Sequence, residues 1–252
     1  MQKQIVVLYN LPGTSTTQNI EEADEDTQNS AREVNDELNK NGYKSGVLGI
    51  TTKDIQSLSN LKTDLVFNLV EWSGKESDLG VEVLNTLDKA KIKYTGSNSF
   101  GYKLTSDKVL MKQQMHKCNI PTPGDKEFPL ILKPSTEHCG IGVSQKSVVT
   151  NEDELQIVND ELRKRFKQPM IVEEFIEGDE AHVTVLEKNG EPWVLPPAIF
   201  RFEKKKDYWP VMSYEAKWDD KSWESDMTYW LDDYDSKIIE NICEIAQKCF
   251  VH

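Results

Sequence analysis

The chain has 252 residues, 43 of them acidic and 30 basic, and a formal net charge of −13. This charge argues against a nucleic-acid or anionic-membrane partner, because either would require a basic face. The sequence contains no apolar run of about 18 residues, so we expect no membrane span. The N-terminal residues lack a signal-peptide cleavage pattern. The four cysteines form no Cys-x-x-Cys pair, so we expect reduced thiols in a cytoplasmic protein.

The first part of the chain has the pattern of a β-α-β-α-β unit. Apolar runs at 4–9, 46–50 and 64–70 predict buried parallel strands. An acidic stretch after the first run is expected to become a helix that ends near Asn41, and a second helix is predicted over Leu79–Lys91. This order predicts a small parallel sheet with helices on both sides.

A second unit is expected after the break at Pro121-Thr-Pro123-Gly124, which follows a predicted helix over 105–117. Residues 203–233 are polar and aromatic with no firm period, and we expect them to form a long functional loop. Asn189-Gly190 predicts a hairpin turn. The other elements predicted in this unit are strands at 128–133, 143–149, 170–176, 180–188 and 193–200, and helices at 151–166 and 235–250.

Lys133 stands at the end of the apolar strand 128–133 and opens a loop rich in small residues. A lysine that ends a buried strand needs an anionic partner, and phosphate is one candidate. The alternative is an ordinary surface lysine. The backbone amides of the following loop, which contains Gly140 and Gly142, are suited to wrap phosphate oxygens. A lone Gly-x-Gly is more often a simple turn.

Carboxylates gather just past the strand 170–176. They are Glu173, Glu174, Glu177, Asp179 and Glu180, with Phe175 and Ile176 among them. Such a segment is often only a solvated strand end, but its backbone can also pair with a purine edge. Together with the lysine and its loop, it indicates ATP bound without a P-loop or a dinucleotide fingerprint.

Two more lysines are candidates for phosphate contact. Lys108 lies near the start of the helix 105–117, where positive charge is favourable only if an anion binds. Lys217 lies in Tyr214-Glu-Ala-Lys217-Trp218, which interrupts a polar stretch. Taken alone, that pentamer is no better than a surface segment.

These motifs resemble those of the D-alanine–D-alanine ligases and their near relatives in the ATP-grasp superfamily. The resemblance runs from Asp64 to about Trp218 and keeps the family's order of motifs. The motifs are Leu65-Val-Phe-Asn-Leu-Val-Glu71, Tyr94-Thr-Gly-Ser97, Asp107-Lys108, Asn119-Ile-Pro-Thr-Pro123, Leu130-Ile-Leu-Lys-Pro134, Val172-Glu-Glu-Phe-Ile-Glu-Gly178 and Tyr214-Glu-Ala-Lys217.

The resemblance implies a fold of mixed α/β and α+β class. Residues 1–100 would form a parallel α/β (pre-ATP-grasp) domain, 101–176 the small ATP-grasp subdomain, and 177–252 the start of the large subdomain. The implied activity is an ATP-dependent carboxylate–amine ligase that works through an acyl phosphate. Its substrates would be amino acids, and its cofactors ATP and magnesium. The family is commonly dimeric, so a homodimer is possible.

The resemblance also implies roles for particular residues. Lys108 and Lys133 would contact phosphates, the loop 135–142 (the candidate phosphate loop) would close over them, and Lys217 would serve catalysis near the transferred phosphate. The remaining nucleotide-binding residues would be Cys139, Gly140 and Gly142 in that loop, Glu173, Glu174, Phe175 and Ile176 at the adenine, and Glu180 at the ribose.

The chain departs from the family pattern at three places. The family's N-terminal Gly-x-Ser segment is not recognisable, and Leu11-Pro-Gly-Thr-Ser15 stands there instead. Cys139 and Trp218 replace a serine and a tyrosine that shape the dipeptide site, which leaves open a ligase for other amino acids or a peptide. The C-terminal segment with the oxyanion arginine and the magnesium ligands is expected to be missing, so we expect nucleotide binding with negligible ligase turnover. A non-catalytic nucleotide-binding ATP-grasp module is the other alternative.

Overall fold

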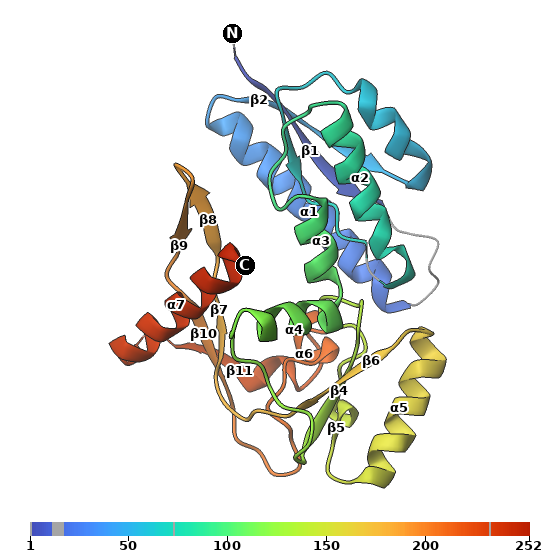
Figure 1. The fold of residues 1–252 in the computed structure, drawn as a ribbon, viewed down its shortest axis with the longest axis vertical. Helices are drawn as coiled ribbons and strands as arrows, with labels where there is room; N and C mark the ends of the chain where they lie inside the picture. Colours follow the sequence, from blue (N-terminus) through green and yellow to red (C-terminus); the bar gives the residue numbers. More distant parts are fainter. Residues whose placement is uncertain (1, 12–17, 73, 232) are drawn as a thin grey trace. The chain divides into compact units, whose positions relative to one another are not determined.

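A computed structural model describes residues 2–11, 18–72, 74–231 and 233–252 (Figure 1). The chain divides into two compact units. The first unit is Met1–Asp107 with Thr136–Ile141, and the second is Lys108–Ser135 with Gly142–His252. The first unit includes most of the candidate phosphate loop. The predicted domain boundary at 100/101 stays a prediction. The subdomain boundary at 176/177 stays a prediction.

The first unit contains a parallel three-stranded sheet of order β2-β1-β3. Its strands are β1 (Gln4–Asn10), β2 (Lys44–Ile50) and β3 (Leu65–Asn68). Its helices are α1 (Gln18–Lys40), α2 (Ser77–Lys89) and α3 (Ser99–Ser106), with short 3₁₀ helices at Thr52–Asn60 and Gly74–Glu76. The three predicted strands and both predicted helices are present, but the order is β-α-β-β-α rather than β-α-β-α-β, because the segment between β2 and β3 forms only a 3₁₀ helix.

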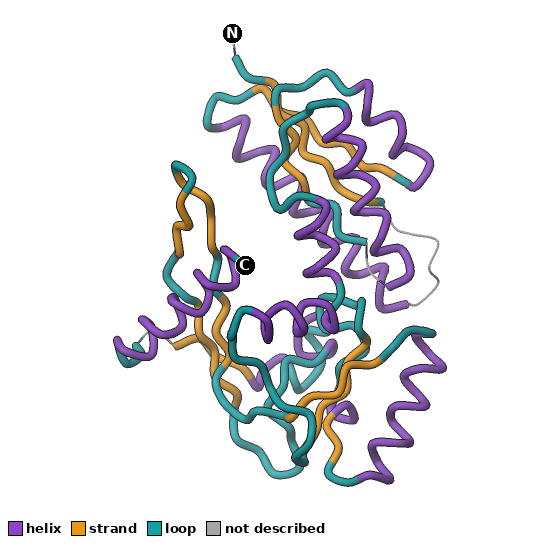
Figure 2. The backbone as a smooth tube through the Cα atoms, in the orientation of Figure 1, coloured by secondary structure: helices purple, strands orange, loops and turns teal. Residues whose placement is uncertain are grey.

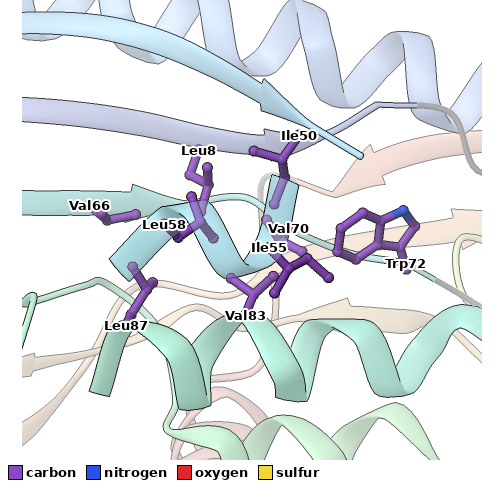
Figure 3. Close-up of a cluster of buried hydrophobic side chains, with 9 residues drawn as sticks. All are labelled: Leu8, Ile50, Ile55, Leu58, Val66, Val70, Trp72, Val83 and Leu87. Carbon is purple, nitrogen blue, oxygen red and sulfur yellow. The ribbon is translucent and has the colours of Figure 1, made fainter. Parts of the chain in front are cut away.

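Alternation along β1 explains why helices cover both faces of this sheet. Leu8 points to one face, where it joins a buried cluster with Leu58 and Leu87 (Figure 3). Val7 and Tyr9 point to the other face and pack with Ala31 of α1. Successive strand residues point to opposite faces, so a strand that is apolar throughout must be covered on both sides.

The second unit is built around two antiparallel sheets, seen as the lower strands of Figure 2. The first sheet has the order β5-β4-β6, with β5 (Val148–Val149), β4 (Leu130–Pro134) and β6 (Met170–Glu174). The second has the order β11-β10-β7, with β11 (Thr228–Leu231), β10 (Ala198–Phe202) and β7 (Glu180–His182). The strands β8 (Val185–Lys188) and β9 (Glu191–Val194) form the predicted hairpin, with positive φ at Asn189 and Gly190.

The helix α5 covers one face of the first of these sheets. The helix α5 (Glu152–Phe166) packs Leu155 and Leu162 against Leu132 of β4. On the opposite face, Ile131 joins a cluster with Val211. The remaining helices of the second unit are α4 (Lys108–Lys117), α6 (Tyr214–Trp218) and α7 (Ser236–Val251), and 3₁₀ helices at Gln145–Ser147 and Ser225–Met227.

Several expected elements differ in the structure. The single helix expected over 105–117 is broken at Asp107, which is extended, because the Lys108 N–H donates to the Ser135 carbonyl rather than within a helix. The expected strand 143–149 is reduced to β5, since residues 145–147 form a 3₁₀ turn. The expected strand 180–188 is divided into β7 and β8. The expected long loop 203–233 contains α6 and β11, which its lack of period had hidden.

Candidate functional site

Glu173 of β6 forms ion pairs with two lysines, Lys133 of β4 and Lys112 of α4. Its Oε2 is 3.2 Å from the Nζ of Lys133, and its Oε1 is 3.2 Å from the Nζ of Lys112. The Glu173 side chain is 12% exposed, against 16% for Lys112 and 31% for Lys133. One carboxylate shared by two ammonium groups leaves a net positive charge in a partly desolvated place, which favours a bound anion.

Lys108 reaches the same end of β4 from the start of α4. Its N–H donates to the Ser135 carbonyl at 2.9 Å, and its Nζ donates to the Pro134 carbonyl at 3.0 Å. This bond holds the Lys108 ammonium group beside the end of β4. The structure therefore brings Lys108 to the end of β4 that carries Lys133, and Glu173 links Lys133 to Lys112. The phosphate role of Lys108 and Lys133 stays a prediction.

Lys112 was not identified from the sequence. It follows Lys108 by four residues on α4, and residues so spaced lie on the same helix face. That spacing was the available signal. The spacing could not single out Lys112, because the helix was expected to run without interruption from residue 105. Nothing in the sequence indicated which face of that helix would contact β6.

Glu180, the predicted ribose ligand, lies on β7 within electrostatic reach of Lys133. Burial raises the pKa of Glu180, while a hydrogen bond from the Met212 backbone and electrostatic interactions with His182 and Lys133 oppose that rise. A half-buried carboxylate with a backbone donor is held in place and can accept hydrogen bonds from hydroxyl groups.

In the segment predicted to line adenine, some backbone N–H groups already donate hydrogen bonds within the protein. The Glu174 N–H donates to the Gly124 carbonyl and the Phe175 N–H to the Pro129 carbonyl, both at 2.8 Å. The Phe175 ring packs edge-on against Trp209, with centroids 5.4 Å apart. Ile176 is 65% exposed, and within the described ranges its N–H has no acceptor. Of these three amides, that of Ile176 is the one available to a purine.

The candidate phosphate loop contains three residues with positive φ: Cys139 at 56°, Gly140 at 79° and Gly142 at 79°. A Cβ on Gly142 would lie 2.6 Å from Pro134 and 2.9 Å from Phe166, so this glycine is needed for space as well as conformation. Cys139 and Gly140 group with the first unit, and Gly142 with the second. Closure of this loop over phosphates stays a prediction.

Lys217, the predicted catalytic residue, is exposed on α6. Its Nζ lies 5.2 Å from the centre of the Trp218 ring. The helix itself is tied to the end of the candidate phosphate loop, because the Tyr214 N–H donates to the Val143 carbonyl at 3.0 Å. No contact recorded among the described residues joins Lys217 to the other three lysines, so its role stays a prediction.

The described residues hold no group of three histidine, cysteine, aspartate or glutamate side chains arranged to bind a metal ion. Residues 12–15 of the segment that replaces the family's N-terminal motif lie outside the described ranges. Of the helices that the structure describes, none is both long and apolar enough to cross a bilayer.

The fold, with an α/β unit that contains a parallel sheet and a second unit that contains two antiparallel sheets, is that of solved D-alanine–D-alanine ligases. Residues 98–252 match the family model described as D-ala D-ala ligase C-terminus, and the chain belongs to that family.

Similar proteins agree with this assignment. An uncharacterised protein of Sinorhizobium fredii, y4sG, is 33% identical over 166 residues, which cover 61% of this chain and 47% of that protein. D-alanine–D-alanine ligase A of Bacillus cereus is 27% identical over 201 residues, covering 73% and 62% of the two chains. The chain spans about half the length of several curated relatives that it matches.

A solved D-alanine–D-alanine ligase from Bacillus anthracis, complexed with ATP, superimposes with a TM-score of 0.69 at 19% identity. That match covers all of this chain and 78% of the solved chain. At such low identity the likeness establishes the fold.

Proposed function

We propose that this protein acts as an ATP-dependent carboxylate–amine ligase of the D-alanine–D-alanine ligase type. The observation that carries the proposal is the convergence of Lys108, Lys112 and Lys133 at the end of β4, with Glu173 between two of them. Bound ATP would supply a phosphoryl group to the carboxylate of one substrate, giving an acyl phosphate that the amine of the second substrate attacks.

The chain's own residues would bind and orient the nucleotide. The lysines would hold the phosphates and stabilise the charge that develops on their oxygens during transfer. Glu173 holds the ammonium groups of Lys112 and Lys133 in place before any ligand arrives, so little reorganisation is needed on binding. The Ile176 N–H would meet the adenine, and Glu180 the ribose. Lys217 would contact the phosphate that is transferred.

The proposal also covers the substrates, the metal ion and the oligomeric state. The substrates are amino acids or a short peptide, and Cys139 and Trp218 stand where the family's dipeptide site has a serine and a tyrosine. Magnesium is expected from phosphate chemistry. No set of three metal-binding side chains lies within the described residues, so we derive no step through a metal. A homodimer and a cytoplasmic location remain predictions.

The test is a calorimetric titration of ADP into the 252-residue protein and two variants. Lys133→Ala removes the central lysine, and Lys164→Ala removes an exposed lysine of α5 in the same unit as a matched control. We expect the unmodified protein and the control to bind alike and Lys133→Ala to bind at least about tenfold more weakly, since a charge-assisted contact is lost. If the unmodified protein does not bind ADP, the proposal is wrong.

A second experiment asks which carboxylate and amine are joined. ATP and a panel of D- and L-amino acids and dipeptides are incubated with the protein, and phosphate release and peptide formation are measured together. Binding of ADP without any turnover across the panel would favour a non-catalytic nucleotide-binding module.

A further inference from the structure

Glu224 is a buried carboxylate that links two separate segments of the second unit. Its side chain belongs to a residue that is only 7% exposed. Its Oε2 accepts one hydrogen bond from the Ser213 Oγ at 2.7 Å and another from the Gln145 Nε2 at 2.9 Å. A buried carboxylate is costly unless it is hydrogen-bonded, so both donors are needed to keep it there.

One of the two linked segments is the start of α6. Ser213 is fully buried and caps this helix, because its Oγ accepts from the Ala216 N–H at 3.0 Å. The Ser213 hydroxyl thus donates to Glu224 and accepts from α6 at the same time. The helix that begins there carries Lys217.

The other segment follows Gly142, the last residue of the candidate phosphate loop. Gln145 pairs with the backbone of Trp209: its Oε1 accepts from the Trp209 N–H at 2.8 Å, and its Nε2 donates to the Trp209 carbonyl at 3.1 Å. The ring of Trp209 in turn packs on Phe175, next to the expected adenine position. Two hydrogen bonds to the Trp209 backbone therefore hold the Gln145 amide in addition to its bond to Glu224.

A carboxylate suits this junction because it can only accept hydrogen bonds. Both partners must turn a donor toward it. The Gln145 amide nitrogen therefore points toward Glu224, and the Gln145 oxygen accepts from the Trp209 N–H. The Ser213 hydroxyl hydrogen also points toward Glu224, so the Ser213 oxygen can accept from the Ala216 N–H. The negative charge of Glu224 also affects Tyr208. Burial is the main cause that raises the pKa of Tyr208 to about 12, and the charges of Glu224 and Glu180 raise it further.

We propose that Glu224 is a positioning residue, which holds α6 against the segment 143–145 and so directs Lys217 toward the terminal phosphate of a bound nucleotide. This inference rests on the proposed function. Lys217 has no anionic partner among the contacts recorded for the described residues, so its placement depends on how the short helix beneath it is held.

The test compares binding of ADP with that of a non-hydrolysable ATP analogue. Lys217 would contact the phosphate that only the analogue carries. We expect Glu224→Ala to lose about tenfold of the preference for the analogue over ADP, the size of one charge-assisted contact, while its ADP affinity stays within about twofold of the unmodified protein. Glu224→Gln presents a carbonyl oxygen to both donors and should restore the preference. Glu187→Ala, which removes an exposed carboxylate from β8, is the control.

Each outcome decides the inference. Equal loss of affinity for both ligands in Glu224→Ala would mean a general structural role and would overturn it. An unchanged preference would also overturn it. Failure of Glu224→Gln to restore the preference would show that the hydrogen bonds are not what directs Lys217.

A second measurement separates this inference from the proposed function. Hydrogen exchange at the amides of Ala216 and Lys217 reports opening of α6 without any ligand. We expect exchange there to be at least about tenfold faster in Glu224→Ala than in Glu224→Gln, with the amides of α5 unchanged. If the unmodified protein binds no nucleotide, the proposed function is wrong. If hydrogen exchange in Glu224→Ala is also unchanged, Glu224 does not hold α6 in place, and the present inference is wrong as well.

Discussion

The Oε1 of Glu173 lies 3.2 Å from the Nζ of Lys112, although 61 positions separate the two residues in the chain. Each side chain is less than one-fifth exposed, so water screens this pair only partly. The second oxygen of Glu173 is engaged by Lys133. The carboxylate therefore offsets one of the two positive charges and leaves the other for a ligand.

This geometry predicts that Lys112 contributes to nucleotide binding. We expect Lys112→Ala to weaken ADP binding about tenfold, which corresponds to the loss of about 1.4 kcal/mol. Lys117→Ala, which removes an exposed lysine from the same helix, should leave the dissociation constant unchanged. Calorimetric titration measures both. Equal affinity in Lys112→Ala and the unmodified protein would mean that Lys112 serves only to hold Glu173.

Gly142 should be intolerant of any side chain. Its φ is +79°, and a Cβ would approach Pro134 and Phe166 closely. We expect Gly142→Ala to lower the free energy of unfolding by about 2–4 kcal/mol, from the left-handed backbone and the overpacking together.

Gly178→Ala is the matched control for that substitution. A Cβ at Gly178 meets no atom within 4 Å, and its φ lies outside the left-handed region. Urea denaturation should find it within about 0.5 kcal/mol of the unmodified protein. A Gly142→Ala protein as stable as this control would contradict the packing that the structure gives to the loop end.

Glu180, the proposed ribose ligand, should also lower the stability of the folded state. Because burial raises its pKa above the ordinary 4.5, the buried charge disfavours the folded state at neutral pH. We expect Glu180→Gln to unfold at a higher temperature than the unmodified protein at pH 7. The difference should shrink as the pH falls through the raised folded-state pKa of Glu180, and it should be lost below about 4.5, where Glu180 is protonated in both states.

The same variant should bind ADP more weakly, because an amide accepts hydrogen bonds from ribose hydroxyls less strongly than a carboxylate does. Thermal unfolding from pH 7 to pH 4 and one ADP titration test both halves. A variant that is destabilised at pH 7 would show that the bond from Met212 outweighs desolvation.

Asp179 should show the opposite dependence on pH. The hydrogen bonds from Arg201, at 2.7 and 2.8 Å, are the main cause that lowers the pKa of Asp179 below 3.8, and Tyr234 contributes a further bond at 2.9 Å. A lowered pKa stabilises the folded state above pH 3.8, and that stabilisation is lost as the pH falls from 3.8 through the folded-state pKa.

Asp179→Asn should therefore be less stable than the unmodified protein at pH 7, and the difference should narrow as the pH falls below 3.8 through the folded-state pKa of Asp179. Denaturant unfolding at several pH values measures the difference, with Asp153→Asn in the first turn of α5 for comparison. A difference in stability that does not change with pH would show that the hydrogen bonds, rather than the charge, matter.

Much of the site was predictable because local patterns carry it. Lys133 follows an apolar strand, the carboxylates follow another, and each motif occupies a few consecutive residues. Lys112 could not be found this way, since its partner is on β6 and only the packing of α4 brings the two together. Glu224 was hidden for the same reason: its donors are 11 and 79 positions away in a region without periodicity.

The sequence alone determined the three strands and the helices α1 and α2 of the first unit, and the resemblance to the ATP-grasp motifs. Apolar periodicity and turn residues act over a few residues, and these are short-range causes. The tertiary structure alone decided the break at Asp107, the grouping of residues 136–141 with the first unit, and the choice of Glu173 as the carboxylate between two lysines. Those outcomes depend on which distant backbone and side-chain groups satisfy one another's hydrogen bonds and charges, and that is settled only when the chain packs.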